Sequence, residues 1–154
     1  MLETVILTLL MAMTPVLELR GALPFGVARG LSLAESLILS IIGNMLPVPL
    51  VMLFSRRIFA WLKHHSKWLG RIAARIEQRA EKKGDIVKKY EVLGLAILVA
   101  IPLPGTGAWT GAIVAALMDI RLKRAVPAIF LGVIAAGLIV CTLTFGVGAL
   151  LGRI

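Results

Sequence analysis

Long apolar stretches alternate along the chain with short stretches that are charged or rich in glycine. Residues 33–54 and 125–151 are each long enough to cross a bilayer, which takes about 20 helical residues. Residues 2–31 and 92–120 are apolar too, but proline, glycine and charged residues interrupt both near the middle. Residues 55–91 are polar and basic. The pattern predicts an all-α membrane protein in which two broken segments each precede a transmembrane helix.

The second broken segment has two short arms around the run PLPGTGAWTG. As a helix its first arm, residues 92–101, would cover ~15 Å, about half of a ~30 Å hydrocarbon core, and the second arm, residues 112–120, is similar. Proline removes hydrogen-bond donors and glycine loosens the backbone, so a continuous helix is not expected. Two arrangements remain, a broken span or a re-entrant hairpin that enters and leaves on one side.

The basic residues favour the hairpin. Eleven of the 17 lie between Arg56 and Lys89, and basic loops beside membrane spans mark the cytoplasmic side. A full crossing over 92–120 would put Arg121 and its basic neighbours outside, whereas a re-entrant hairpin keeps them inside. We therefore expect the hairpin over 92–120, followed by a span over 125–151 that runs outward.

Extended backwards from Arg56, the same reasoning orients the N-terminal half. If 33–54 ends inside, the broken segment 2–31 enters from outside and returns there. Its second arm, about residues 25–31, is short, so a plain span is the alternative. A hairpin and a span in each half, oppositely oriented, make an inverted-topology repeat, and interrupted segments at matching positions indicate a transporter binding site. Pro15 against Pro102 is the sequence anchor.

Three units follow: a first repeat over 1–54, a cytoplasmic linker over 55–91 and a second repeat over 92–154. The linker has apolar residues at helical spacing and basic residues on another face, which predicts an amphipathic helix on the anionic inner membrane surface. A soluble helix pair packed on a partner is the alternative. His64 and His65 are adjacent and cannot face one metal ion together, so we expect no metal site.

Glu18 and Arg20 are the main chemical candidates of the first broken segment. Charged groups at membrane depth cost about 2.5–3.5 kcal/mol each on insertion scales, so each is a functional hypothesis. In one interpretation Arg20 meets an anionic head group and Glu18 carries a proton; in the other the two form a structural ion pair. In extended chain both would project to one side, and in a helix they would diverge. Arg29 is a further candidate, or only an exterior anchor.

The second loop offers backbone groups and hydroxyls instead of charges. Its second arm would begin at the hairpin tip, where a helix N-terminus presents unpaired N–H groups that bind anions. The glycines equally suit close packing, and Trp109 an interfacial position. The candidate binding residues are Pro102, Pro104, Gly105, Thr106, Gly107, Trp109 and Thr110.

Other polar and special residues have simpler interpretations. Asn44, with Pro47 and Pro49, would form a gate or a fixed bend in the 33–54 span. Asp119 is expected to pair with Arg121 in solvent. The single cysteine allows no disulfide framework and is expected to pack in a helix. The N-terminus lacks the basic region of a signal peptide, so we expect the first stretch to be retained.

Composition agrees with a membrane protein. The chain has 154 residues, of which 59% are hydrophobic, and a mean hydropathy of +0.96. A net charge of +9 is compatible with nucleic-acid binding, but the clustering of the basic residues between apolar blocks excludes that interpretation. No nucleophile-elbow, P-loop, dinucleotide or zinc motif is present in the sequence, so we expect neither an enzyme nor a cofactor.

The runs PVLELRGALPFGVARG and PLPGTGAWTGA resemble the small multidrug export protein family, over nearly the whole chain. That family is considered a distant relative of the DedA and VTT-domain membrane proteins, which have two re-entrant hairpins, each followed by a transmembrane helix. The resemblance implies proton-coupled transport of lipid carriers or phospholipids. It matches Glu18 and Arg20 to the acid and arginine of the first hairpin, and Pro102, Pro104 and Gly105 to the second hairpin's turn. The second loop departs from the superfamily pattern, because it has neither an acid nor an arginine.

We therefore expect a DedA-like secondary transporter or flippase that moves an amphiphile with an anionic head group, such as a polyprenyl phosphate or a phospholipid, with proton coupling. One alternative is a multidrug exporter of cationic lipophilic compounds with Glu18 as the counter-charge. The other is a membrane scaffold that does not transport. The expected setting is the inner (plasma) membrane, as a multi-pass protein and a homodimer.

Overall fold

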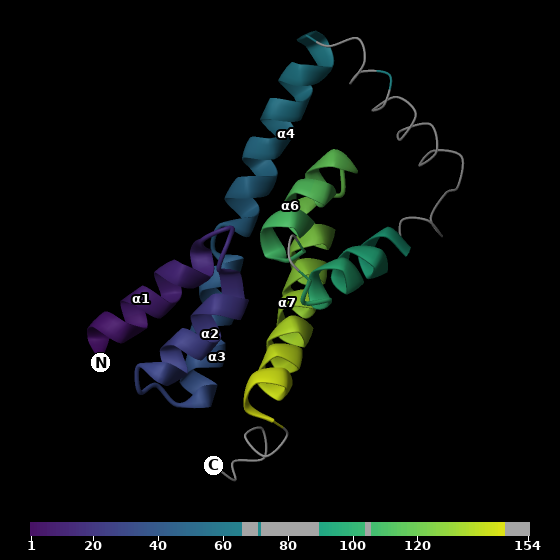
Figure 1. The fold of residues 1–154 in the computed structure, drawn as a ribbon. Coiled ribbons are helices and arrows are strands. Elements are labelled where there is room, and N and C mark those ends of the chain that lie inside the picture. The colour runs from purple at the N-terminus through teal and green to yellow at the C-terminus, as the bar shows by residue number, and fades with distance from the viewer. Residues whose placement is uncertain (66–70, 72–89, 104–105, 147–154) are drawn as a thin grey trace.

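The computed structural model describes residues 1–65, 71, 90–103 and 106–146, and the regular structure of these residues is helical (Figure 1). Three helices of the N-terminal half pack on one another, and a second group follows in the C-terminal half. The elements are α1 (Leu2–Met13), α2 (Glu18–Ala28), α3 (Leu33–Met45), α4 (Val48–His65), a helix over Tyr90–Ala100, α6 (Ala108–Leu117) and α7 (Leu122–Phe145).

Two stretches of the described chain are long and apolar enough to cross a membrane, Leu33–Ile58 and Leu122–Phe145. The first joins α3 to the start of α4 across a break at Leu46 and Pro47. Pro47 and Pro49 have no N–H group, so neither can donate to a carbonyl one turn earlier, and the helix breaks at this point.

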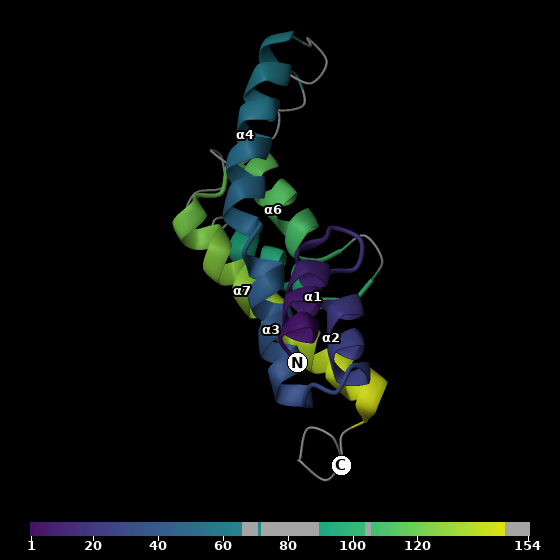
Figure 2. The same cartoon turned by 90° about the vertical axis from the view of Figure 1, so that its left-hand side faces the viewer.

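α4 runs past the predicted end of the span, residue 54, as far as His65. Figure 2 shows it extending beyond the other helices. The basic helix expected in the linker therefore begins within α4, whereas most of the linker lies outside the described residues.

Each broken segment contains two helices, and both second arms begin earlier than predicted. α2 begins at Glu18 instead of near residue 25, and α6 begins at Ala108 instead of 112. Pro24 lies inside α2 and Gly111 inside α6, so these residues do not end the helices. Helix-breaking residues are tolerated in membrane helices because neighbouring helices can satisfy the backbone groups that they free.

The turns that follow α2 and α6 are built alike. In each, a residue just beyond the helix adopts the left-handed conformation, with φ of 93° at Gly30 and 54° at Asp119, which is 89 positions later. In each, the next N–H group reaches back to a carbonyl five positions earlier, as at many helix C-termini. These bonds run from Leu31 to Gly26 and from Ile120 to Ala115, at 3.0 and 2.9 Å.

The helices that follow these turns also meet the first arms in matching ways. A Cβ added at Gly43 of α3 would lie 2.6 Å from the carbonyl oxygen of Leu9, and one added at Gly132 of α7 would lie 2.6 Å from that of Ala96. Small residues allow such close backbone approach between membrane helices. The two glycines are 89 positions apart, whereas the two contacted residues of the first arms, Leu9 and Ala96, are 87 apart. The second segment therefore has two more residues than the first between its first arm and the following helix.

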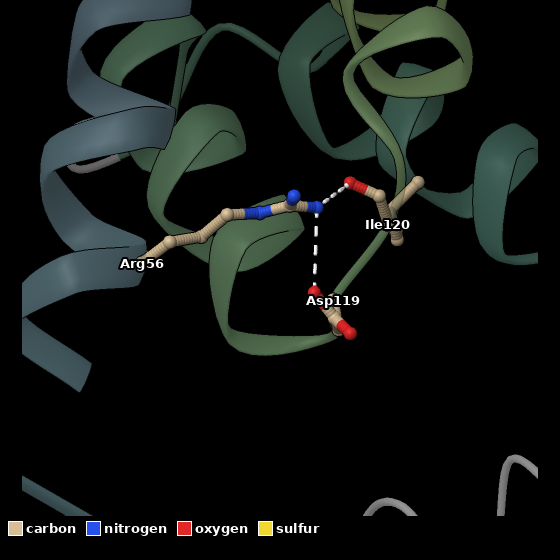
Figure 3. Close-up of polar contacts among 3 residues, drawn as sticks. All are labelled: Arg56, Asp119 and Ile120. Atoms are coloured by element: carbon tan, nitrogen blue, oxygen red, sulfur yellow. Dashed lines mark hydrogen bonds and ion pairs between the residues drawn. The ribbon is translucent and has the colours of Figure 1, made fainter. Parts of the chain in front are cut away.

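Arg56 connects α4 to the turn after α6 (Figure 3). Its guanidinium lies 3.5 Å from the carboxylate of Asp119 and also donates to the carbonyl of Ile120. The expected pairing of Asp119 with Arg121 is wrong for the described residues, because the packing of α4 on α6 brings Arg56 over this turn. Figure 1 shows the turn after α6 and the turn after α2 towards opposite ends of the molecule.

Candidate functional site

The two hairpin tips meet between the two groups of helices. Glu18 begins α2, and Gly107 is the residue before α6. They are 89 positions apart (18 against 107), and both have positive φ, 48° and 143°. Such backbone is unusual for glutamate, and strained residues of this kind cluster at ligand sites and switch regions.

Glu18 places its carboxylate at the N-terminus of α6. The residue is 6% exposed, and its Oε1 accepts a hydrogen bond from the backbone N–H of Trp109 at 3.4 Å. A Cβ added at Gly107 would lie 2.6 Å from Glu18 Cδ, so only glycine leaves room for the carboxyl group. The N-terminus of a helix carries a positive partial charge and unpaired N–H groups. Glu18 therefore occupies a natural anion site of the other hairpin.

Arg20 of the first hairpin binds carbonyl groups of the second hairpin, at the end of the helix that precedes α6. Its guanidinium donates to the carbonyls of Ile101 at 3.3 Å, Leu103, and Thr106 at 2.8 Å, and to the Thr106 hydroxyl at 2.9 Å. The helix before this loop ends at Ala100, because Pro102 cannot continue it, and a helix C-terminus leaves carbonyls without donors. A cation at that end has the stabilising sign.

Trp109 repeats the geometry of Arg20 from the second hairpin. It lies 89 positions after Arg20 (20 against 109), and its indole Nε1 donates to the carbonyl of Met13, the last residue of α1, at 3.0 Å. In both cases a side chain of the second arm donates a hydrogen bond to a carbonyl at the end of the other segment's first arm. The positions match, but the chemistry differs, because one hairpin contributes a guanidinium and the other an indole.

Glu18 and Arg20 diverge, as predicted for a helix. Leu19 between them is 2% exposed and packs in the core, near Gly137 of α7. Among the described residues each charged group binds the second hairpin, and no ion pair joins the two. The structural ion pair considered from the sequence is therefore not what closes this loop.

The remaining predicted residues divide into three groups. Thr106 lies in the site, where its hydroxyl can donate its one hydrogen to the carbonyl of Ile101, at 2.6 Å, or to that of Leu103, at 2.8 Å. Thr110 lies on α6, half-buried, whereas Pro104 and Gly105 fall outside the described residues. Arg29 lies at the other end of α2, away from the site, with its guanidinium 5.3 Å from the ring centre of Phe25.

A cavity of about 10 Å³ adjoins these groups, and the sequence interpretation missed the polar residue Asn44 in its lining. Asn44 of α3 is 3% exposed, and its side-chain oxygen has no hydrogen-bond partner in the described part of the chain. The signal was an amide inside an apolar span, which we interpreted only as a gate or a bend. The lining includes Glu18, Arg20, Asn44, Val99, Gly107 and Val133.

The described residues form an all-helical protein with two stretches that are long and apolar enough to cross a membrane. The chain belongs to the family described as "putative small multi-drug export protein", whose family model matches residues 18–139. This part of the resemblance is confirmed, and it names a transport role instead of an enzyme class. The relation to the DedA and VTT-domain proteins stays a prediction. No significant match was found among curated proteins or solved structures.

The contact between Glu18 and Gly107 predicts an energetic coupling. Gly107→Ala should destabilise the protein through its φ of 143° and through its clash with the Glu18 carboxyl group. In a Glu18→Ala background only the backbone strain remains, so the same substitution should lose about 1–2 kcal/mol less. Unfolding of the detergent-solubilised variants measures the cycle.

Gly94→Ala is the matched control, because nothing lies within 4 Å of a Cβ at that position. Its effect should be the same with and without Glu18. Additive effects of Gly107→Ala and Glu18→Ala would mean that the carboxyl group does not lie at the N-terminus of α6.

Proposed function

We propose that this protein is a proton-coupled secondary transporter of an amphiphile with an anionic head group, such as a polyprenyl phosphate or a phospholipid. The observation that supports this most is the buried Glu18 carboxylate at the N-terminus of α6. The carboxylate occupies the position that an anionic head group would take.

Protonation of Glu18 would free this position. The ionised carboxylate balances the positive end of α6 and the nearby Arg20 guanidinium. The neutral acid removes one negative charge and leaves a site with net positive charge. An anionic head group then restores the balance, so proton and substrate bind together, and loss of the proton returns Glu18 to α6 and expels the head group.

The matched turns support alternating access to this site. The turns after α2 and α6 have the same hydrogen-bond pattern, and Figure 1 shows the two turns towards opposite ends of the molecule. Arg56 of α4 contacts Asp119 in the turn after α6, so the chain is at the same level of the molecule at residues 56 and 119. This placement favours a re-entrant hairpin over 92–120, and with it a DedA-like inverted-topology repeat whose halves rock about the shared tips.

The setting follows from the same topology. The protein is a multi-pass protein of the inner (plasma) membrane, with residues 55–91 in the cytoplasm against anionic lipid. It acts as a homodimer, because so short a chain leaves only a small cavity of its own around the site.

A second candidate function is export of cationic lipophilic compounds, which the family description favours. Glu18 would then be the counter-charge of the drug, and the cation would displace a proton from it. Arg20 variants do not separate the two functions, because Arg20 also holds the loop carbonyls that end the first arm. The charge of the transported compound separates them.

Cysteine labelling at two matched positions tests the inverted repeat. Arg29 and Met118 are 89 positions apart and both exposed, and the buried Cys141 is replaced by alanine to give an unreactive background. A membrane-impermeant maleimide should label Arg29→Cys in right-side-out vesicles and Met118→Cys in inside-out vesicles. Labelling of both from one side would contradict the opposite orientations.

Transport in liposomes tests the function. The purified protein should move a head-group-labelled polyprenyl phosphate between leaflets, faster with an imposed proton gradient, as followed with an impermeant quencher. Glu18→Gln should slow this movement about tenfold or more, since a charge-assisted hydrogen bond contributes about 1.5–3 kcal/mol. Movement of a lipophilic cation alone would favour drug export, and movement of neither would favour the scaffold.

Glu35→Gln is the control for this substitution. Glu35 pairs with Ser32 in a capping box at the start of α3, and glutamine also serves that role. The same chemical change is thus made outside the site, and transport should stay within about twofold of the native rate. An equal loss in both variants would contradict the role of Glu18.

A further inference from the structure

The cavity beside the hairpin tips holds one unsatisfied hydrogen-bond acceptor. Asn44 is 3% exposed, lines the cavity, and its side-chain oxygen has no partner among the described residues. A buried polar atom without a partner is costly, and in native structures such atoms often mark a bound water, an ion or a catalytic role. This oxygen needs a donor.

The charged groups of the lining do not supply that donor while Glu18 is ionised. A carboxylate only accepts hydrogen bonds, and the hydrogen bonds of the Arg20 guanidinium go to the carbonyls of Ile101, Leu103 and Thr106. The rest of the lining is apolar or backbone. Protonation of Glu18 adds an O–H donor to this lining, beside the N–H groups of Arg20 and of the backbone at the start of α6.

The volume of the cavity limits what can connect Glu18 to Asn44. A cavity of about 10 Å³ has room for about one water molecule. A sodium ion of similar size would lie beside the Arg20 guanidinium and the positive end of α6, which disfavours a cation. A neutral water suits the site, because it can accept from the acid and donate to the amide oxygen.

We propose that this cavity is a one-water proton site, in which a single water accepts a hydrogen bond from protonated Glu18 and donates one to the Asn44 side-chain oxygen. The proposal rests on the proposed role of Glu18 as the proton carrier. Asn44 is then a positioning residue that stabilises the neutral acid away from α6. Among the described residues that line the cavity, Glu18 is the only one with an acidic side chain.

Infrared spectroscopy of the reconstituted protein tests this. In phosphatidylcholine membranes, which do not titrate near neutral pH, the carbonyl band of protonated Glu18 is identified by its loss in Glu18→Gln. In Asn44→Leu the neutral acid loses its acceptor network, so the half-protonation pH of this band should fall by about half to one unit. The band should also shift in frequency.

Two further variants keep the test decisive. Ser40→Ala is the matched control, because Ser40 lies one turn earlier on α3, is fully buried and also has an unpartnered oxygen, but does not line the cavity. It should leave the band unchanged. Asn44→Ser keeps an acceptor oxygen and should recover part of the shift, and it replaces Asn44→Leu if that variant does not fold.

An unchanged band in Asn44→Leu and Asn44→Ser would overturn the proposal, as would the absence of any Glu18-dependent band across the stable pH range. The measurement needs no substrate. Lack of lipid movement in liposomes together with an intact band shift would therefore refute the transporter and leave the proton site standing.

Discussion

Two charges of the first hairpin hold the broken ends of the second, and the rest of the site depends on this interaction. A helix that stops inside a membrane leaves N–H groups at one end and carbonyls at the other, and no water is there to bind them. Glu18 meets the N–H end of α6, and Arg20 meets the carbonyls where the preceding helix stops. Each charge has the sign that its helix end requires.

Several backbone features recur 89 positions apart in the two halves, but the side chains at these positions differ. Position 18 corresponds to 107 and position 20 to 109, so a glutamate faces a glycine and an arginine corresponds to a tryptophan. The second loop needs no acid of its own, because the Glu18 carboxyl group fills the space where a side chain at Gly107 would lie.

The sequence predicted the interrupted segments and the two spans, because apolar length is a local property, whereas the functional roles of Glu18 and Arg20 stay predictions. It misjudged where α2 and α6 begin, since proline and glycine are tolerated in helices whose neighbours satisfy the freed groups. It also missed what Arg20 binds, because the carbonyls that accept from its guanidinium lie more than 80 positions away along the chain. The features that recur 89 positions apart are features of backbone geometry, and the residue types at these positions differ, so the sequence contains little sign of them.

The most direct test of the central claim is the sign of the proton exchange that accompanies binding. An anionic amphiphile is added to purified protein in a weakly buffered solution, and a pH indicator reports protons taken up or released. If head group and Glu18 carboxylate exclude one another at α6, binding should take up about one proton per head group above the pH at which Glu18 ionises, and none in Glu18→Gln. Binding without proton uptake, or proton release on adding a lipophilic cation instead, would contradict it.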